Sequence, residues 1–120
     1  MPDQPLQWVE ISRKALAHNI REFRRIIGPR RKFLAVVKAN AYGHGLTTVA
    51  GLALENGVDW LGVNSVEEGA SLRGAGIEAP ILVLGYSPLG ALEEAVAGDL
   101  RLTVYNRETV AMLVAALWTI

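Results

Sequence analysis

The sequence contains no cysteine among its 120 residues. A disulfide scaffold, a thiolate metal site and a cysteine nucleophile are therefore all excluded. No apolar run approaches the length of about 20 residues that a membrane-spanning helix needs, and the N-terminus lacks the apolar stretch of a secretory signal. From these absences we expect no membrane partner and a cytoplasmic location.

The net charge is zero, but its distribution is uneven. Residues 1–38 contain nine Lys or Arg against three Asp or Glu, whereas residues 39–120 contain three against nine. Aromatic residues suited to base stacking are not interleaved with the basic ones, so we expect a solvated helix face and no nucleic-acid partner. A surface for anionic partners is the alternative. The basic residues of this face lie on the side of a predicted helix away from its apolar stripe. They are Arg13, Lys14, Arg21, Arg24 and Arg25.

Apolar residues recur at helical spacing between positions 12 and 27, which predicts a first helix. Ser12 is suited to cap its start, and Gly28-Pro29 is a strong stop signal. The run at 33–37 is short, apolar and partly β-branched, and it predicts a buried strand. The apolar residues of the helical stripe are Leu16, Ile20, Phe23 and Ile27.

Strands and helices alternate through the rest of the chain. Further strands are predicted at 59–63, 80–84 and 100–104, with a helix at 46–56 between the first two strands. Ser65 and Glu68 have the spacing of a capping box, and Asn106 is suited to cap a last helix. Ser87-Pro88 is interpreted as the N-cap and first residue of the helix that Gly98 ends.

Strands that begin near 33, 59, 80 and 101 have the repeat of βα units in a parallel sheet, so the fold class is α/β. Either a doubly wound open sheet or half of a (β/α)8 barrel accepts four such units. A complete barrel takes about 250 residues, and the sequence ends in an apolar helical pattern without a C-cap. We therefore expect a partial TIM barrel, about the first four βα units, in a truncated product.

The run Ala35-Val36-Val37-Lys38-Ala39-Asn40-Ala41-Tyr42-Gly43-His44-Gly45 carries the chemistry. It places Lys38 at the carboxyl end of a buried strand, where barrel enzymes build their active sites. A lysine amine is a nucleophile toward carbonyl carbon, and the small residues beyond it leave room for a bulky ligand. From spacing alone, a surface lysine that begins a loop is the alternative. His44, between two glycines, is expected to be structural.

These eleven consecutive residues resemble the cofactor-lysine motif of alanine racemases. The segments 10–12, 64–69 and 81–85 are similar too, so the resemblance extends to about Arg107. Ornithine-type decarboxylases and small cofactor-carrying barrel proteins also place a lysine after the first strand, but they usually lack the Ala-Asn-Ala-Tyr-Gly-His-Gly continuation. The resemblance implies that residues 1–120 are the N-terminal half of a racemase barrel domain, preceded by an N-terminal strand and helix, without the C-terminal β-domain.

The resemblance also implies a cofactor and a site. The cofactor is pyridoxal 5'-phosphate, bound as a Schiff base by Lys38, which is also the catalytic residue, and no metal is expected. Tyr42 is implied to hydrogen-bond the cofactor phosphate; packing of the loop is the alternative. Val36, Leu82 and Leu84 are candidates for the cofactor wall, with generic barrel filling as the alternative.

Further expectations concern parts beyond this sequence. The resemblance implies that a second acid–base group is a tyrosine of a C-terminal β-domain from the other subunit of a homodimer. It also implies that a strand at 7–11 packs with that domain. We expect an alanine racemase that interconverts L- and D-alanine for cell-wall precursor supply, here truncated and inactive alone. A non-catalytic barrel protein that binds pyridoxal phosphate is the alternative.

Overall fold

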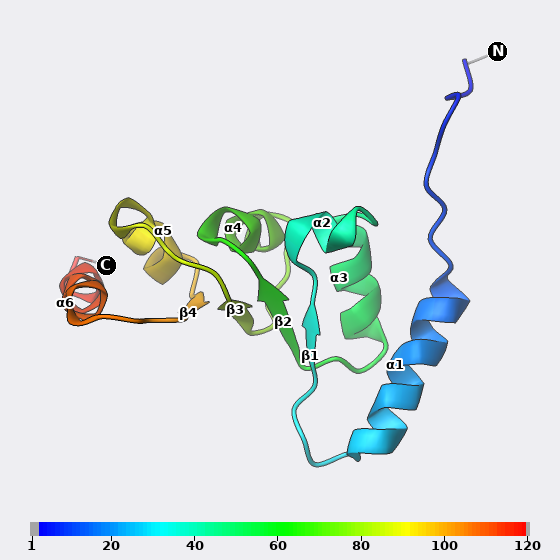
Figure 1. Ribbon diagram of the computed structural model, residues 1–120, viewed down its shortest axis with the longest axis horizontal. Helices are drawn as coiled ribbons and strands as arrows, with labels where there is room; N and C mark the ends of the chain where they lie inside the picture. The colour runs from blue at the N-terminus through cyan, green and yellow to red at the C-terminus, as the bar shows by residue number, and fades with distance from the viewer. Residues whose placement is uncertain (1–2, 120) are drawn as a thin grey trace.

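A computed structural model describes residues 3–119. Its fold is built on a four-stranded parallel sheet with the strand order β1-β2-β3-β4 (Figure 1). Every strand pair is parallel, which confirms the predicted βα repeat. The elements are α1 (Arg13–Ile27), β1 (Leu34–Val36), α2 (Lys38–Tyr42), α3 (Leu46–Glu55), β2 (Trp60–Val63), α4 (Val66–Gly74), β3 (Ile81–Val83), a 3₁₀ helix (Leu89–Ala91), α5 (Leu92–Ala97), β4 (Arg101–Leu102) and α6 (Arg107–Leu117).

One face of the sheet forms the hydrophobic core. Side chains alternate between the two faces of a strand, and those on this face are covered by buried residues of α3, α4 and α5. Such complete burial stabilises the fold by about 1.5–3 kcal/mol for each large aliphatic side chain. The strand residues with no exposed surface are Leu61, Val63, Ile81 and Val83.

The opposite face of the sheet is less covered. Val36, Gly62 and Leu82 are partners in the strand register, so they share this face, and Val36 is 39% exposed. A doubly wound sheet would carry helices on both faces and reverse its strand order. Sequential strand order with the core helices on one face is the arrangement of a barrel, in which this second face lines the interior. The sheet is therefore the first four βα units of a partial TIM barrel.

Helix ends follow the sequence at three of the predicted caps. The hydroxyl of Ser12 accepts a hydrogen bond from the amide of Ala15, and the side-chain oxygen of Asn106 accepts one from Thr109. Ser65 accepts from the amide of Glu68 at 3.2 Å, which is one half of the predicted capping box. These bonds satisfy amide groups that have no partner within their own helix.

The predicted cap at Ser87-Pro88 is wrong. Pro88 has ψ 148°, so its backbone is extended, and it precedes a 3₁₀ helix. The Ser87 hydroxyl is buried and has no hydrogen-bond partner within residues 3–119. A Ser-Pro pair alone thus does not determine where a helix starts.

The expected strand at 7–11 is also wrong. Residues 3–12 form no strand, and Figure 1 shows this segment extending away from the body of the molecule. A strand requires another strand to pair its amide and carbonyl groups, and the described residues offer none at this place. The exposed side chains of Leu6, Trp8 and Val9 agree with a segment that is not packed.

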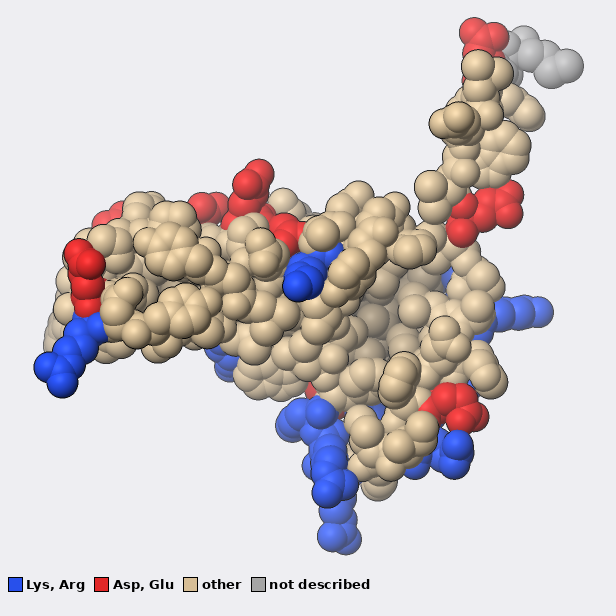
Figure 2. Space-filling model, viewed as in Figure 1, with Lys and Arg blue, Asp and Glu red and all other residues tan. Residues whose placement is uncertain are grey.

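The basic face of α1 is solvated only in part. Arg25 pairs with Glu22 at 3.0 Å and Arg13 with Glu55 at 3.8 Å, both at the surface. Arg24 differs from the prediction, because its guanidinium is half-buried and bonds to Asp59 and to backbone carbonyls. Figure 2 shows basic side chains gathered over the end of α1 and the loop that leads to β1.

Asp59, just before β2, joins three segments. Its carboxylate accepts from Arg24 at 2.7 Å and from the amide of Phe33 at 2.8 Å. The bond from Arg24 and then the bond from Phe33 hold the pKa of Asp59 below its ordinary value of 3.8, against a smaller opposite effect of burial. The folded structure thus stabilises the ionised carboxylate of Asp59 at this edge of the sheet.

Candidate functional site

Lys38 lies directly after β1, at the carboxyl edge of the sheet. The preceding residue is fixed, because the amide of Val37 donates to the carbonyl of Gly62 at 2.8 Å and the Val37 side chain is buried. Lys38 is half-buried, whereas Lys14 and Lys32 are exposed. Among residues 3–119 its amine has no ion-pair partner. The amine is therefore free to react with a ligand at this edge.

The segment after Lys38 is a left-handed turn, where we expected an ordinary loop. Ala39, Asn40, Ala41 and Tyr42 have φ values of 52°, 55°, 53° and 55°. L-residues avoid this region because the Cβ atom approaches the backbone, at a cost of about 1–2 kcal/mol for each residue. Four such residues in a row persist only where the surroundings determine the conformation.

Hydrogen bonds around Asn40 hold the turn. Its side-chain oxygen accepts from the amide of Leu46 at 2.8 Å, at the start of α3. Its carbonyl accepts from Gly43 and Gly45, at 3.1 and 3.0 Å. Its amide donates to the carboxylate of Glu68 at 3.3 Å, and Glu68 belongs to α4. Asn40 thus connects the turn to two neighbouring helices.

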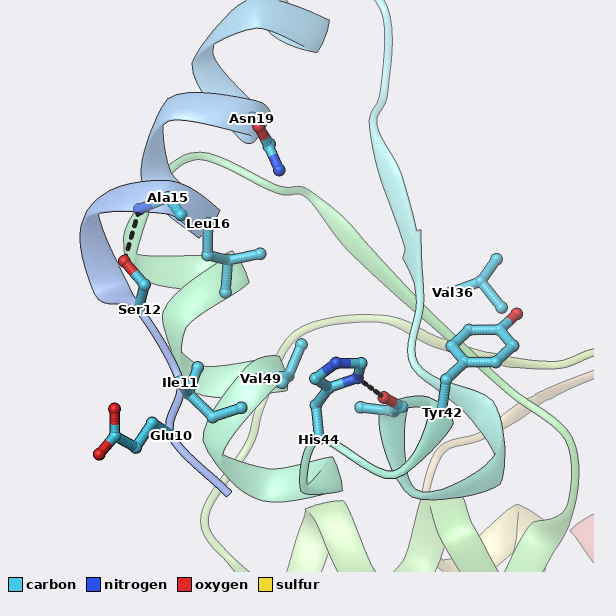
Figure 3. A pocket seen from close by; sticks show the side chains of 11 residues that line it. Glu10, Ile11, Ser12, Ala15, Leu16, Asn19, Val36, Tyr42, His44 and Val49 are labelled. Atoms are coloured by element: carbon cyan, nitrogen blue, oxygen red, sulfur yellow. Dashed lines mark hydrogen bonds between the residues drawn. The ribbon is translucent and has the colours of Figure 1, made fainter. Parts of the chain in front are cut away.

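Tyr42 lies over the first strand, where the inner face of the sheet reaches its carboxyl edge. In Figure 3 its ring lies beside Val36, and its side chain is 62% exposed. Both residues line a cavity of about 440 Å³ between α2, α3 and the start of α1. The hydroxyl of Tyr42 is accessible, as a phosphate ligand requires. Lys38 itself is not one of the residues that line this cavity.

The three predicted wall residues share one face of the sheet. A Cβ atom added to Gly62 would lie 3.2 Å from Leu84 and 3.5 Å from Val36, so these side chains converge on the glycine. Leu82 is the register partner of Gly62 on the next strand. The structure therefore brings Val36, Leu82 and Leu84 together into one apolar surface, with Tyr42 beside Val36.

His44 has the structural role that the two flanking glycines suggested. Its Nδ1 lies 2.9 Å from the carbonyl oxygen of Ala41, and its amide donates to the same oxygen. A carbonyl only accepts, so Nδ1 carries the hydrogen in this contact. The ring thereby closes the end of the left-handed turn. No group of three or more His, Cys, Asp or Glu within residues 3–119 is placed to hold a metal ion.

These residues fit pyridoxal phosphate. A free amine suits its aldehyde, the apolar surface around Gly62 suits an aromatic ring, and an exposed phenol suits its phosphate. Small residues follow the lysine in the sequence, and only glycine fits at position 85 after β3, because a Cβ atom there would lie 2.4 Å from the carbonyl oxygen of Asn64. The fit rests on the chemistry of the side chains at one edge of the sheet.

Two residues of the site were missed from the sequence. Asn40 lies inside the motif, but no local signal shows that it connects the turn to α3. Glu68 was recognised as part of a capping box, yet its carboxylate accepts from Asn64 at 2.9 Å and from Asn40, a residue of another loop. The spacing of a capping box reveals a helix start and not a contact between two loops.

Comparisons with known proteins agree with this geometry. The family described as "Alanine racemase, N-terminal domain" matches residues 11–118. Alanine racemase 2 of Caldanaerobacter subterraneus is 49% identical over 105 residues, which cover 88% of this chain and 27% of that protein. The chain thus spans about a quarter of the length of this relative.

Solved structures show the same likeness. The alanine racemase of Bacillus anthracis with bound L-Ala-P has a TM-score of 0.88 and 40% identity, over 97% of this chain and 30% of that one. The alanine racemase of Clostridium difficile 630 has a TM-score of 0.86 and 36% identity, over 88% of this chain and 28% of that one. The match by sequence, by fold and by the residues around Lys38 means that the chain belongs to the alanine racemase family, whose N-terminal domain it resembles over residues 11–118.

Proposed function

We propose that Lys38 binds pyridoxal 5'-phosphate covalently and that the protein is an alanine racemase, which interconverts L- and D-alanine. The observation that carries the proposal is the position of Lys38. This half-buried residue follows β1 at the carboxyl edge of a barrel sheet and begins the left-handed turn. Family membership supports the reaction type, because the matched relatives are named alanine racemases.

Each residue of the site has a task in this proposal. Tyr42 would hold the phosphate by a hydrogen bond, and Val36, Leu82 and Leu84 would contact the ring and exclude water from it. When bound, the cofactor supplies an electron sink for the charge left on an amino acid that loses its α-proton. The Nζ atom of Lys38 would take or return that proton on one face of the substrate.

Racemisation needs a second acid–base group, because a proton must leave from one face and return on the other. Tyr86 and Tyr105 follow β3 and β4, and both are exposed. The hydroxyl of Tyr105 lies 3.5 Å from the carbonyl of Leu84, at the margin of a hydrogen bond. We assign the second group to a tyrosine of a C-terminal β-domain, contributed by the other subunit of a homodimer.

The substrate and its setting follow from the same proposal. Among the relatives, the Clostridium difficile racemase has been solved in complex with cycloserine and the Bacillus anthracis racemase with bound L-Ala-P. These names support a small amino acid as ligand. We further propose that the product D-alanine serves cell-wall precursor supply and that the enzyme acts in the cytoplasm. No helix described here is long and apolar enough to cross a membrane.

A competition among the three lysines tests the cofactor site. The chain is incubated with limiting pyridoxal phosphate, reduced with borohydride and digested, and the adducts are mapped by mass spectrometry. Lys14 and Lys32 are exposed and serve as internal controls. The proposal predicts that Lys38 is modified first and that Lys38→Arg removes the visible absorbance of the complex. If the lysines were modified in the order of their solvent exposure, with Lys38 last, there would be no cofactor site at Lys38.

A further inference from the structure

The carboxylate of Glu68 connects two loops at the carboxyl edge of the sheet. One oxygen accepts from the amide of Asn64, directly after β2, at 2.9 Å. The other accepts from the amide of Asn40, in the turn after Lys38, at 3.3 Å. In an ordinary capping box the third residue of the helix bonds back to the N-cap amide. Here the bond is made one residue earlier, which leaves the second oxygen for the lysine turn.

The turn at 39–42 depends on contacts from outside itself. Most of its hydrogen bonds are made within the segment 37–46, for example from the amide of Ala41 to the carbonyl of Val37 at 2.8 Å. Within residues 3–119, the bond from Asn40 to Glu68 is the one hydrogen bond that joins residues 39–42 to a part of the chain outside the segment 37–46. A strained backbone needs such a contact to hold one orientation relative to the sheet.

We propose that Glu68 is a positioning residue for Lys38 and Tyr42. Its carboxylate fixes the left-handed turn against the end of β2, so that the amine and the phenol at the two ends of the turn hold their places over the sheet. This inference rests on the proposed function of Lys38. Glu68 contacts backbone amides of other loops and acts on the lysine only through the turn.

The charge and the length of the side chain both matter for this role. A carboxylate accepts at two oxygens, whereas the amide of glutamine has one acceptor and one donor group. Glu68→Gln therefore keeps the volume and loses one of the two bonds. Since a hydrogen bond to a charged group contributes about 1.5–3 kcal/mol, we expect the rate of adduct formation at Lys38 to fall by about tenfold or more.

The measurement is the rate at which borohydride-trapped pyridoxal phosphate appears on Lys38, divided by the rate on Lys14 of the same sample. Two variants are matched controls. Ser65→Ala removes the side-chain cap of α4 and so lowers the stability of this helix, but it leaves the bond from Asn40 to Glu68. Glu67→Gln removes an exposed acidic charge from the same helix turn. Circular dichroism establishes that each variant is folded at the temperature used.

We expect Glu68→Gln to lower the ratio and both controls to keep the wild-type ratio. Exchange of the Asn40 amide hydrogen, followed by NMR, should be faster in Glu68→Gln and unchanged in Glu67→Gln. A wild-type ratio in Glu68→Gln would overturn the inference, as would an equal loss in Ser65→Ala, since helix stability alone would then explain the effect. If the wild-type chain shows no preference for Lys38, the proposed function fails first, which is a distinct result.

Discussion

The two edges of the sheet are built in different ways. At the amino edge, two arginines bind the backbone of several loops. Arg73 donates to the carbonyls of Gly98, Ile77 and Ala79 at 2.7, 2.8 and 2.8 Å. Arg24 donates to the carbonyl of Gly57 and to Asp59, at 2.8 and 2.7 Å. Each guanidinium thereby joins segments that are far apart in the sequence.

The carboxyl edge has small residues, a strained turn and accessible functional groups. Lys38 and Tyr42 lie at the two ends of this turn, and Glu68 joins it to the next loop. Barrel enzymes place catalytic groups at this edge and stabilising contacts at the other. Changes at the amino edge should therefore alter the free energy of unfolding, and changes at the carboxyl edge should alter ligand binding.

The largest effect on stability is expected for Arg73→Ala. This change leaves three half-buried carbonyl groups without their charged donor, so the free energy of unfolding should fall by about 3 kcal/mol. Arg107→Ala is the matched control, because Arg107 is exposed at the start of α6, and it should stay within about 0.5 kcal/mol of wild type. Urea denaturation measures both, and equal stability of the two variants would remove the distinction between the edges.

Tyr42→Phe should weaken cofactor retention by about 1–2 kcal/mol, the contribution of one hydrogen bond to a charged phosphate. The free energy of unfolding should not change, because the Tyr42 side chain is 62% exposed. Tyr86→Phe, at 63% exposure, is the control. Titration of pyridoxal phosphate by absorbance gives the dissociation constants, and an unchanged constant for Tyr42→Phe would mean that the tyrosine only packs.

The smallest effect concerns the pH dependence of the amino edge. The folded pKa of Asp59 is lowered, so its ionised form adds stability above the ordinary pKa of 3.8, and this contribution is lost as the pH falls through the folded value. Asp59→Asn should therefore be less stable than wild type at pH 7, by less than about 1 kcal/mol because the pair is partly solvated. Denaturation at pH 7 and at a pH below the folded pKa of Asp59 should show that the stability difference between wild type and Asp59→Asn disappears in acid. A difference that stays constant with pH would contradict an ionic origin of this stabilisation.

Much of the fold was predictable because its signals are local. Helical spacing from Leu16 to Ile27 predicted α1, and the repeat of apolar runs predicted the parallel strands. The side chains of Ser12, Ser65 and Asn106 marked helix starts, since a cap is a contact across three residues. The place of Lys38 after the first strand was predictable because the strand and the lysine are adjacent in the sequence, whereas its role as the cofactor lysine comes from the family resemblance and stays a prediction.

The rest depends on contacts between distant residues. No residue of 39–42 is a glycine, so local propensity disfavours the left-handed turn. It is held by a hydrogen bond that the Leu46 amide donates to Asn40 and by one that the Asn40 amide donates to Glu68. The two bridging arginines bind carbonyl groups, which any sequence provides, and their targets are known only after folding. The strand expected at 7–11 failed for a similar reason, since a strand is determined by its partner.

The assignment of Lys38 as the cofactor lysine can be tested by racemisation in a chimeric enzyme. In the chimera, residues 11–118 of this protein replace the matching segment of the Caldanaerobacter alanine racemase. The conversion of L- to D-alanine is measured for the unaltered chimera and for its Lys38→Ala and Lys32→Ala variants. We expect Lys38→Ala to lose activity by orders of magnitude and Lys32→Ala, at the amino edge, to keep it. Turnover by the Lys38→Ala form close to that of the unaltered chimera would contradict the assignment of Lys38.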